Sequence, residues 1–400
     1  AVRVPTVQAG GALKTSNSSA VERTVSIAED RFGRSVRPVA FLEEDGRMLV
    51  STGFDAANWL LLDREANVLS QRLRRASVMI SGTGETLWMR NWIGHLCPAD
   101  KEMNARWKMH VPPLGLKGRD WSCSGRTKLT HPTSDDIFLA GQNYAARLRP
   151  DGTLCWHYDD TQTWSQADHM RHPRGISLLG VSPDGRHLLA MAFGTTLYYW
   201  NFVTGLARPE AILLDAETGK VIWRKGGLQL NHAAAAITND HVLLGSSAPD
   251  NSFIAVYDLS GRPQARMHLP GGLAVARLAD GGRRIIGRRV AWDRRRRLAV
   301  GAEGPLVSIS LADRQVTELG NAQGLHHWAV SPDGTRVLVS TTDDQLVCYT
   351  PDGKRQWEKQ LPESSFRWAP DSRSLLVGTS LGRLLALDRA GKELWRKDLM

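Results

Sequence analysis

Several signatures that would place a sequence in a familiar class are missing from this one. No apolar run reaches about 18 residues, the length that a membrane-spanning helix needs, so we expect no membrane span. The sequence also has no P-loop, no G-x-S-x-G, no H-E-x-x-H and no G-x-G-x-x-G leading into a helix. No convincing amphipathic helical stretch is present. These absences argue against the common nucleotide-binding and hydrolytic enzymes and against a helical fold.

Cysteine is scarce, with four in 400 residues. No C-x-x-C or C-x-x-C-H pattern occurs, which argues against a zinc ribbon and a c-type haem. Cys97 and Cys123 flank one irregular segment, and they either form a disulfide or remain separate thiols. Cys155 and Cys348 lie in strand-like runs, where we expect them to be small buried residues.

The chain begins at Ala1 without an initiator methionine or a signal peptide, as a mature exported protein does. We therefore expect a periplasmic or secreted protein whose signal peptide has been removed. Residues 1–21 are rich in Ser, Thr, Gly and Ala, and are expected to form a flexible lead before a single domain over 22–400.

The charge balance is basic, with 51 Lys and Arg against 41 Asp and Glu. Most of the excess is arginine scattered over turns, so basic charge alone does not predict nucleic-acid binding. The densest run of basic residues is Arg294 to Arg297, which is expected to lie in a turn next to an inner strand. It is either a solvated turn or a contact for an anionic partner.

A tandem repeat is the main signal in the sequence. Residues 328–357, 366–395 and 178–191 with 211–223 each read as four short apolar strands separated by turns. The first turn is S-P-D-G or a relic of it, in which Pro fixes φ and Gly accepts the left-handed conformation. It occurs at Pro183-Asp184-Gly185 and Pro332-Asp333-Gly334, with weaker forms that include Gly82-Thr83-Gly84, Thr238-Asn239-Asp240 and Asp293-Arg294.

The last turn carries a second mark, G-x-x-x-W. A tryptophan placed four residues after this glycine falls on the outermost strand, where its ring can cover the seam to a neighbouring unit. The pattern occurs four times at one phase of the repeat, which indicates an architectural role for Trp156, Trp223, Trp357 and Trp395.

Four short strands per unit, repeated every 40–50 residues or so, are typical of a β-propeller. We predict an all-β propeller with four-stranded antiparallel blades, eight by preference and seven if residues 91–125 are an irregular insertion. Residues 22–28 read as one additional strand that helps to close the ring. The expected blades are 36–73, 74–125, 126–160, 174–225, 230–270, 285–320, 325–361 and 364–399.

The segment from Leu213 to Trp223 resembles the repeat of the quinoprotein-type (PQQ-like) propellers, and Leu385 to Trp395 is a second copy. The S-P-D-G units are also similar to those of YVTN and WD40-like propellers. The resemblance covers roughly residues 36–399 and implies the fold, whereas its families include dehydrogenases, assembly scaffolds and binding modules. The dehydrogenases imply a quinone on a disulfide of adjacent cysteines and a carboxylate-bound ion. This sequence has no adjacent cysteines, so PQQ is not expected.

Propellers usually bind ligands at one mouth of the central channel. The residues expected there are His172, Arg174, Asn231, His232, His326, His327 and Arg367. Three of these histidines, His172, His232 and His327, are candidate ligands for a divalent metal or a source of a catalytic base. The alternative is that each histidine caps a strand or bonds a loop carbonyl. An aromatic-rich segment adds Trp92, Trp107 and Trp121, which either stack on a sugar or peptide or pack on their own blade.

We therefore expect a non-catalytic, monomeric scaffold of the cell envelope or extracellular space that binds a protein or carbohydrate at the channel mouth. No cofactor is predicted. The alternative is a His- and metal-dependent lyase acting on acidic polysaccharide, and a PQQ-dependent dehydrogenase is the third hypothesis.

Overall fold

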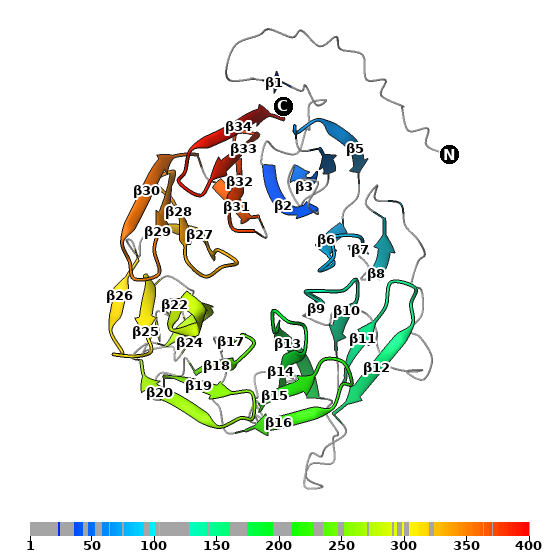
Figure 1. Cartoon of the computed structure of the whole chain (residues 1–400), viewed down its shortest axis with the longest axis vertical. Coiled ribbons are helices and arrows are strands. Elements are labelled where there is room, and N and C mark those ends of the chain that lie inside the picture. The colour runs from blue at the N-terminus through cyan, green and yellow to red at the C-terminus, as the bar shows by residue number, and fades with distance from the viewer. Residues whose placement is uncertain are drawn as a thin grey trace.

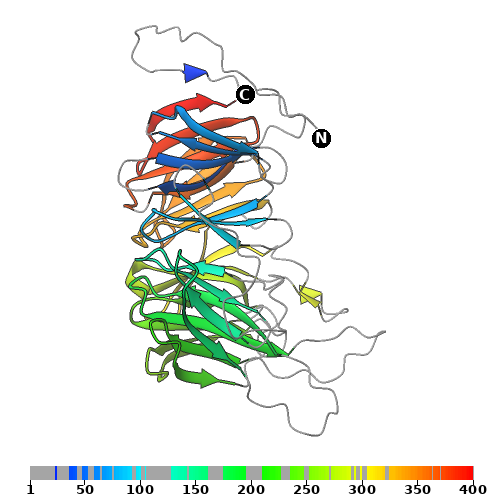
Figure 2. The ribbon, with the colours of Figure 1, turned by 90° about the vertical axis from the view of Figure 1, so that its right-hand side faces the viewer.

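Eight small sheets follow one another around a common centre, and the ring that they form is flat when seen from its edge (Figures 1 and 2). The prediction of an eight-bladed, mostly four-stranded antiparallel propeller is confirmed. The computed structural model describes residues 23–24, 36–42, 47–52, 58–63, 65–73, 76–91, 96–100, 104, 128–141, 144–160, 174–194, 210–226, 235–246, 252–269, 272–289, 292–293, 298–299, 304–319, 324–362, 364–369 and 371–399.

Each blade runs from an inner to an outer strand in chain order. Blades 1 to 4 contain β2 (Val36–Leu42), β3 (Arg47–Thr52), β4 (Asn58–Leu62), β5 (Val68–Leu73); β6 (Ala76–Ile80), β7 (Leu87–Asn91), β8 (Leu96–Ala99); β9 (Lys128–Thr130), β10 (Ile137–Ala140), β11 (Tyr144–Leu148), β12 (Leu154–Asp159); and β13 (Arg174–Val181), β14 (His187–Gly194), β15 (Glu210–Asp215), β16 (Val221–Lys225).

The other four blades complete the circle. They contain β17 (Ala235–Ile237), β18 (His241–Ser246), β19 (Phe253–Asp258), β20 (Pro263–His268); β21 (Leu273–Ala279), β22 (Arg284–Arg289), β25 (Leu306–Ser310), β26 (Val316–Glu318); β27 (Leu325–Val330), β28 (Val337–Thr341), β29 (Gln345–Tyr349), β30 (Arg355–Gln360); and β31 (Ser364–Trp368), β32 (Ser374–Thr379), β33 (Arg383–Asp388), β34 (Glu393–Asp398).

The ring closes between the first and last blades. Buried side chains of blade 1, such as Val50 and Leu60, pack against Leu376 and Leu384 of blade 8 in one apolar cluster. The additional strand expected near residues 22–28 is β1 (Arg23–Thr24), which pairs in parallel with the outer strand β34. It therefore extends the outer edge of blade 8, while the packing of whole blades closes the ring.

The turn after the inner strand also ties several blades to their neighbours. In blade 7 the Ser331 hydroxyl donates to Asp333 Oδ1 (2.6 Å), and Gly334 takes φ +70°. The Asp333 N–H then donates to Ser372 Oγ in the corresponding turn of blade 8 (3.0 Å). Similar links between neighbouring turns join Gly82 N to Ser134 O, His131 Nε2 to Gly185 O, Asp184 N to Asn239 Oδ1, and Asp280 N to Gly334 O.

The tryptophans of the G-x-x-x-W pattern reach across the outer seams. Trp156, Trp223 and Trp357 each donate their indole N–H to a backbone carbonyl of the next blade. The acceptors are Ala216 O (2.9 Å), Leu259 O (3.1 Å) and Arg389 O (3.0 Å). Trp156 and Trp223 are buried and Trp357 is half-buried, so the ring leaves water and its one polar hydrogen is satisfied at the same seam.

The glycine of the pattern makes room for the tryptophan of the preceding blade. A Cβ added to Gly219 or Gly391 would lie 2.6 Å from an atom of the Trp156 or Trp357 indole, respectively. Both glycines also have positive φ, at +70° and +82°, which L side chains rarely adopt. The repeat thus has two linked halves: its glycine receives one indole, and its own tryptophan enters the next glycine turn. We call this contact the indole–glycine interlock.

Some blades have another residue in the register position of the tryptophan. Trp223 lies opposite Leu213, next to a β-bulge, and Ala265 lies opposite Val256 next to the same kind of bulge in blade 5. By the same register, Ser70 takes the position in blade 1 and Thr317 takes it in blade 6. The interlock therefore does not close every seam among the described residues.

The expected boundary of the sixth blade, 285–320, is wrong. Its inner strand is β21 (Leu273–Ala279), and the turn that follows is a short 3-10 segment, η2 (Asp280–Gly282), rather than Asp293-Arg294. Asp293 lies instead in a two-stranded hairpin, β23 (Trp292–Asp293) with β24 (Leu298–Ala299), inserted between β22 and β25. This hairpin stands off one face of the ring (Figure 2). The Arg294 to Arg297 run falls between its strands, outside the described residues.

The interlock predicts unequal costs for two matched glycine substitutions. Gly391→Ala and Gly281→Ala both place a Cβ at positive φ, which costs about 1–2 kcal/mol, but nothing lies within 4 Å of the Cβ at Gly281. Because the Cβ at position 391 also displaces the Trp357 ring, Gly391→Ala should lose about 1–3 kcal/mol more. Urea denaturation of the two variants measures this difference. Equal losses would show that the ring does not depend on the missing Cβ.

Candidate functional site

The inner strands of the ring carry positive charge and no carboxylate. None of the eight inner strands β2, β6, β9, β13, β17, β21, β27 and β31 contains Asp or Glu. Their basic residues are Arg37, Lys128, Arg174, Arg277 and Arg367, with His326 and His327 in addition. These strands surround the axis (Figure 1), so the charged residues on the strands nearest to it are all basic.

Arg277 and Arg367 occupy the same register position in their blades. Arg277 is paired with Ile286, which is paired with Ser308, and Arg367 is paired with Leu376, which is paired with Ala386. On the outer strands, Ser308 is paired with Thr317 and Ala386 is paired with Trp395. Both partners stand at the position where the repeat has tryptophan. The two arginines therefore lie at the same level around the axis, on blades 6 and 8.

Neighbouring blades have small residues at this level. The register places Ala329 there in blade 7, Gly180 in blade 4 and Ala236 in blade 5. The blade between the two arginines therefore presents a methyl group at their level, that of Ala329. The arrangement favours an approach of both arginines to a shared ligand in the axial opening.

Both arginines combine solvent access with confinement. Their side chains are exposed, yet burial lowers the pKa of Arg277 and of Arg367 from the ordinary value. Each guanidinium is therefore reached by water and also lies close to protein atoms. Coulomb interactions are stronger near protein atoms than in bulk water, because the effective dielectric constant is lower.

His327 lies on the blade between the two arginines. Its ring is 4.7 Å from the Phe366 ring, centroid to centroid, and its side chain is exposed. Burial, followed by the positive charge of Arg367, lowers the pKa of His327 from 6.5. The imidazole is therefore mainly neutral at pH 7 and becomes a third cation only when an anion or acid raises its protonation.

These groups can hold an anion chemically. A guanidinium presents a planar fork of donors that matches a carboxylate, sulfate or phosphate, and a neutral histidine adds one more donor. No carboxylate on the inner strands competes for them. Among the described residues, no group of three His, Cys, Asp or Glu side chains could hold a metal ion.

The structure brings His327 and Arg367 of the expected mouth residues into this site. Arg174 begins inner strand β13 and His326 lies on β27, but their side chains are outside the described part of the structure. The remaining candidates for the mouth, the metal site and the aromatic loop also fall outside the described residues, namely His172, Asn231, His232, Trp92, Trp107 and Trp121.

The cysteines fall in three kinds of place. Cys348 is buried, and burial raises the pKa of its thiol to about 12, while Cys155 is half-buried. Cys97 lies on β8, where its thiol donates to the Pro98 carbonyl oxygen at 3.5 Å. Cys123 is outside the described residues, so the Cys97–Cys123 disulfide stays a prediction.

Sequence reasoning missed Arg277. The expected sixth blade began at residue 285, which left out β21 and with it this arginine. The pair Gly281-Gly282 after an apolar run is the sequence signal that could have indicated this turn. In the structure both glycines have positive φ. A turn assigned there would have placed Arg277 on an inner strand.

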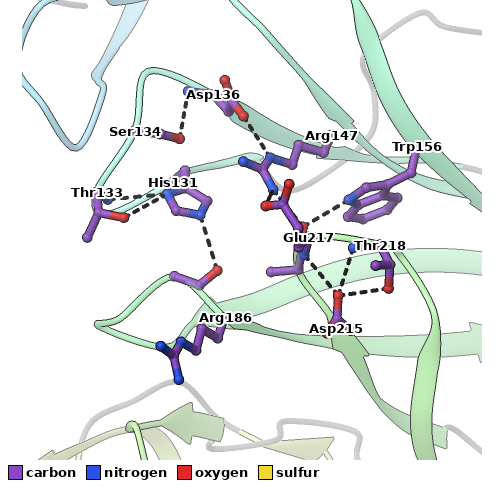
Figure 3. A network of polar contacts seen from close by, with 12 residues as sticks. His131, Thr133, Ser134, Asp136, Arg147, Trp156, Arg186, Asp215, Glu217 and Thr218 are labelled. Atoms are coloured by element: carbon purple, nitrogen blue, oxygen red, sulfur yellow. Dashed lines mark hydrogen bonds and ion pairs between the residues drawn. The ribbon is translucent and has the colours of Figure 1, made fainter.

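A second polar cluster lies at the seam between blades 3 and 4 (Figure 3). Arg147 donates to Asp136 Oδ2 (2.7 Å) in its own blade, and to Glu217 and the Ala216 carbonyl (3.2 Å) in the next. Burial alone lowers the pKa of Arg147, but hydrogen bonds to Glu217 and Asp136 outweigh burial and raise it. The Ala216 carbonyl also accepts the Trp156 indole. The members of this cluster satisfy one another, so it joins two blades rather than offering a site.

Comparisons with known proteins agree with this architecture. Residues 289–400 match a family model (PQQ_2) described as "Outer membrane protein assembly factor BamB". The match covers the last part of the chain, and it shows that blades 7 and 8, with part of blade 6, are similar to PQQ-like repeats. Curated protein sequences give no match.

Several solved structures share the fold. BamB from Moraxella catarrhalis is 14% identical, with a TM-score of 0.52 over 93% of this chain and 98% of that one. The dihydro-heme d1 dehydrogenase NirN is 13% identical, with a TM-score of 0.54 over 93% and 75%. AztD from Citrobacter koseri is 13% identical, with a TM-score of 0.53 over 91% and 95%. At these identities each likeness establishes the propeller fold and leaves the activity open.

The described residues contain no helix with the length and apolar character that crossing a membrane requires.

The cluster in Figure 3 predicts a large difference between two substitutions at one seam. The side chains of Arg147 and Asp136 are 9% and 10% exposed, whereas that of Glu217 is 76% exposed. Arg147→Met leaves Asp136 buried without its cation and should cost about 3–5 kcal/mol. Glu217→Gln removes a screened surface charge and should cost less than about 1 kcal/mol. Chemical denaturation at neutral pH checks this order, and a larger loss for Glu217→Gln would contradict it.

Proposed function

We propose that this protein is a non-catalytic binding platform of the cell envelope, whose axial opening holds an acidic segment of a partner protein. The observation that carries the proposal is the one-signed charge of the eight inner strands, on which Arg277, His327 and Arg367 follow one another over blades 6 to 8. A protein partner and an envelope location are supported by the match of residues 289–400 to a model described as an outer membrane protein assembly factor.

The confined arginines provide the affinity. Removal from bulk water makes the charged state of Arg277 and Arg367 less favourable, which is why burial lowers both pKa values. A carboxylate that enters the opening offsets this cost by charge-assisted hydrogen bonds, which are roughly twice as strong as neutral ones. A segment with several carboxylates can reach both guanidinium groups at the same level of the ring. An acidic polysaccharide would use the same contacts, so the experiment must separate the two.

Binding of a fluorescein-labelled oligoglutamate tests the proposal by fluorescence anisotropy. Arg277→Gln and Arg367→Gln should each weaken binding about tenfold, which corresponds to about 1.4 kcal/mol. Arg355→Gln is the matched control, because it removes the same charge from an exposed side chain of outer strand β30 and should leave binding unchanged. Unlabelled alginate serves as the competing carbohydrate.

Three outcomes distinguish the hypotheses. Loss of oligoglutamate binding in the inner-strand variants alone supports the proposal. Equal losses in all three variants would show non-specific attraction to net positive charge. If alginate binds more tightly than oligoglutamate and depends in the same way on Arg277 and Arg367, the ligand of the axial opening is a carbohydrate rather than a protein.

The site also predicts that anion binding becomes tighter as the pH falls. The pKa of His327 lies below 6.5 in the unliganded protein, because of burial and Arg367. A bound anion favours the imidazolium, so binding takes up a proton and tightens as the pH falls below 6.5, by up to about tenfold for each unit that the anion raises this pKa. Dextran sulfate is a suitable probe because its charge does not change in this range. His327→Gln should remove the increase, and an increase that persists in this variant would place the titrating group elsewhere.

A further inference from the structure

The seam between blades 5 and 6 lacks the tryptophan that the repeat places at three other seams. Ala265 stands opposite Val256 beside a β-bulge, the register that Trp223 has in blade 4. On the other side of the seam Leu311 is the counterpart of Ala216, because each donates its N–H to an arginine carbonyl, Arg283 O (3.0 Å) and Arg186 O (2.8 Å) respectively. Ala216 O receives the Trp156 indole. Among the described tryptophans, none donates to Leu311.

A cavity of about 530 Å³ occupies this part of the seam. Its apolar lining, called the floor below, contains Val256, Ala265 and Leu311, which belong to or pack against the apolar cluster that joins blades 5 and 6. Its polar lining, called the rim, contains His241, Gln264, Asp280, Arg283, Arg284 and Ser310. An apolar floor with a few polar groups around it is typical of small ligand sites, and the volume falls within the usual range of about 300–1,000 Å³.

The charges around the cavity have a positive surplus. Asp280 on the rim is engaged by Arg283 at 2.7 Å, while Arg284 contacts the Ser308 hydroxyl at 3.4 Å. A smaller hollow along the same seam shares Val256, Ala265 and Leu311 with the cavity and adds Arg266 and Arg314. Two more carboxylates bond residues of the cavity lining: Asp313 accepts from Ser310, and Asp258 accepts from Gln264 (3.0 Å). Four arginines therefore border the seam against three aspartates, and the surplus of one positive charge favours an occupant with negative charge.

Arg314 takes the place that glycine has at the interlocked seams. It has positive φ (+61°), like Gly219 and Gly391, but it carries a side chain. A tryptophan fixed to β20 would meet that side chain, whereas a ring that enters from outside is not held to the same path. The guanidinium at this position can instead contact an aromatic face or an acidic neighbour of the entering residue.

We propose that this seam is a socket for a tryptophan side chain of a partner protein, presented in an acidic peptide segment. The ring lies on Val256, Ala265 and Leu311, its N–H points to the backbone at Leu311, and flanking carboxylates contact Arg283, Arg284 or Arg314. Aromatic anchors in desolvated pockets dominate many protein interfaces, and the three interlocked seams of this ring show that its blades accept an indole in this register. The socket is separate from the axial opening, and its occupancy does not depend on the function proposed there.

Fluorine NMR of a short acetylated peptide tests the socket. The probe carries one fluorotryptophan flanked by aspartates, and the same peptide with alanine in place of the aromatic residue is the competitor control. We expect the fluorine signal to shift or broaden with the native protein, and the alanine peptide not to displace the probe. A peptide that gives no change at millimolar protein and peptide concentrations would overturn the proposal.

Variants then place the binding at the seam. Ala265→Trp with Arg314→Gly restores the interlock of the other seams and should abolish binding while preserving or raising the melting temperature. Ala265→Leu fills the floor with a smaller change, in case the double variant does not fold, and should weaken binding at least about tenfold. Arg284→Gln should weaken binding about three- to tenfold.

A matched variant separates the socket from the axial site. Arg277→Gln with Arg367→Gln removes two positive charges from the inner strands and should leave the fluorotryptophan peptide bound. Binding that survives Ala265→Leu and disappears in this inner-strand variant would assign the peptide to the axial opening and overturn the socket.

Discussion

The packing of an indole into a glycine turn of the next blade is the constraint on which much of this structure depends. A four-stranded sheet cannot bury both of its faces alone, so each blade is stable only against its neighbours. Leucine, valine and alanine fill the middle of every seam between described blades, but non-directional packing alone does not fix how two twisted sheets meet. The indole does, because one hydrogen bond from Trp156, Trp223 or Trp357 and one missing Cβ on the neighbour define the approach. The turns on the inner side add a second set of links between blades.

This division of labour separates stability from binding. Inner-strand side chains such as Leu178 and Phe366 pack in the seams between blades, whereas Arg277 and Arg367 of the same layer are exposed. Burial lowers the pKa of both arginines, so a nearby anion would favour their charged state. The same logic applies where the interlock is missing. The seam with Ala265 in place of tryptophan has enough apolar surface to hold its blades together, and it retains a cavity that a foreign side chain can enter.

The fold could be predicted from the sequence because its turns contain glycine and proline, which have strong conformational preferences. The S-P-D-G and G-x-x-x-W patterns locate the blades wherever glycine, proline and tryptophan are retained, as in blades 4, 7 and 8. The first turn of blade 6 was missed because Asp280-Gly281-Gly282 has no proline. In addition, the Asp293-Arg294 pair of the β23–β24 hairpin resembles the turn of the repeat and was assigned in its place. Inner-strand positions could be predicted only where the strands were assigned correctly: His327 and Arg367 do lie on inner strands, whereas Arg277 was missed together with its strand. No sequence pattern marks Ala265. Its importance is visible only in the structure, where it is paired with Val256 at the position that tryptophan occupies in other blades.

Exchange of the indole N–H protons measures the central interaction most directly. Proton–nitrogen correlation spectra, assigned through single Trp→Phe variants, would follow exchange with deuterium at Trp156, Trp223 and Trp357. The account predicts that these three protons exchange only when the whole ring unfolds, with the same dependence on denaturant as the slowest backbone amides. Rapid exchange of these protons in an otherwise protected protein would show that the indoles do not hold the blades together.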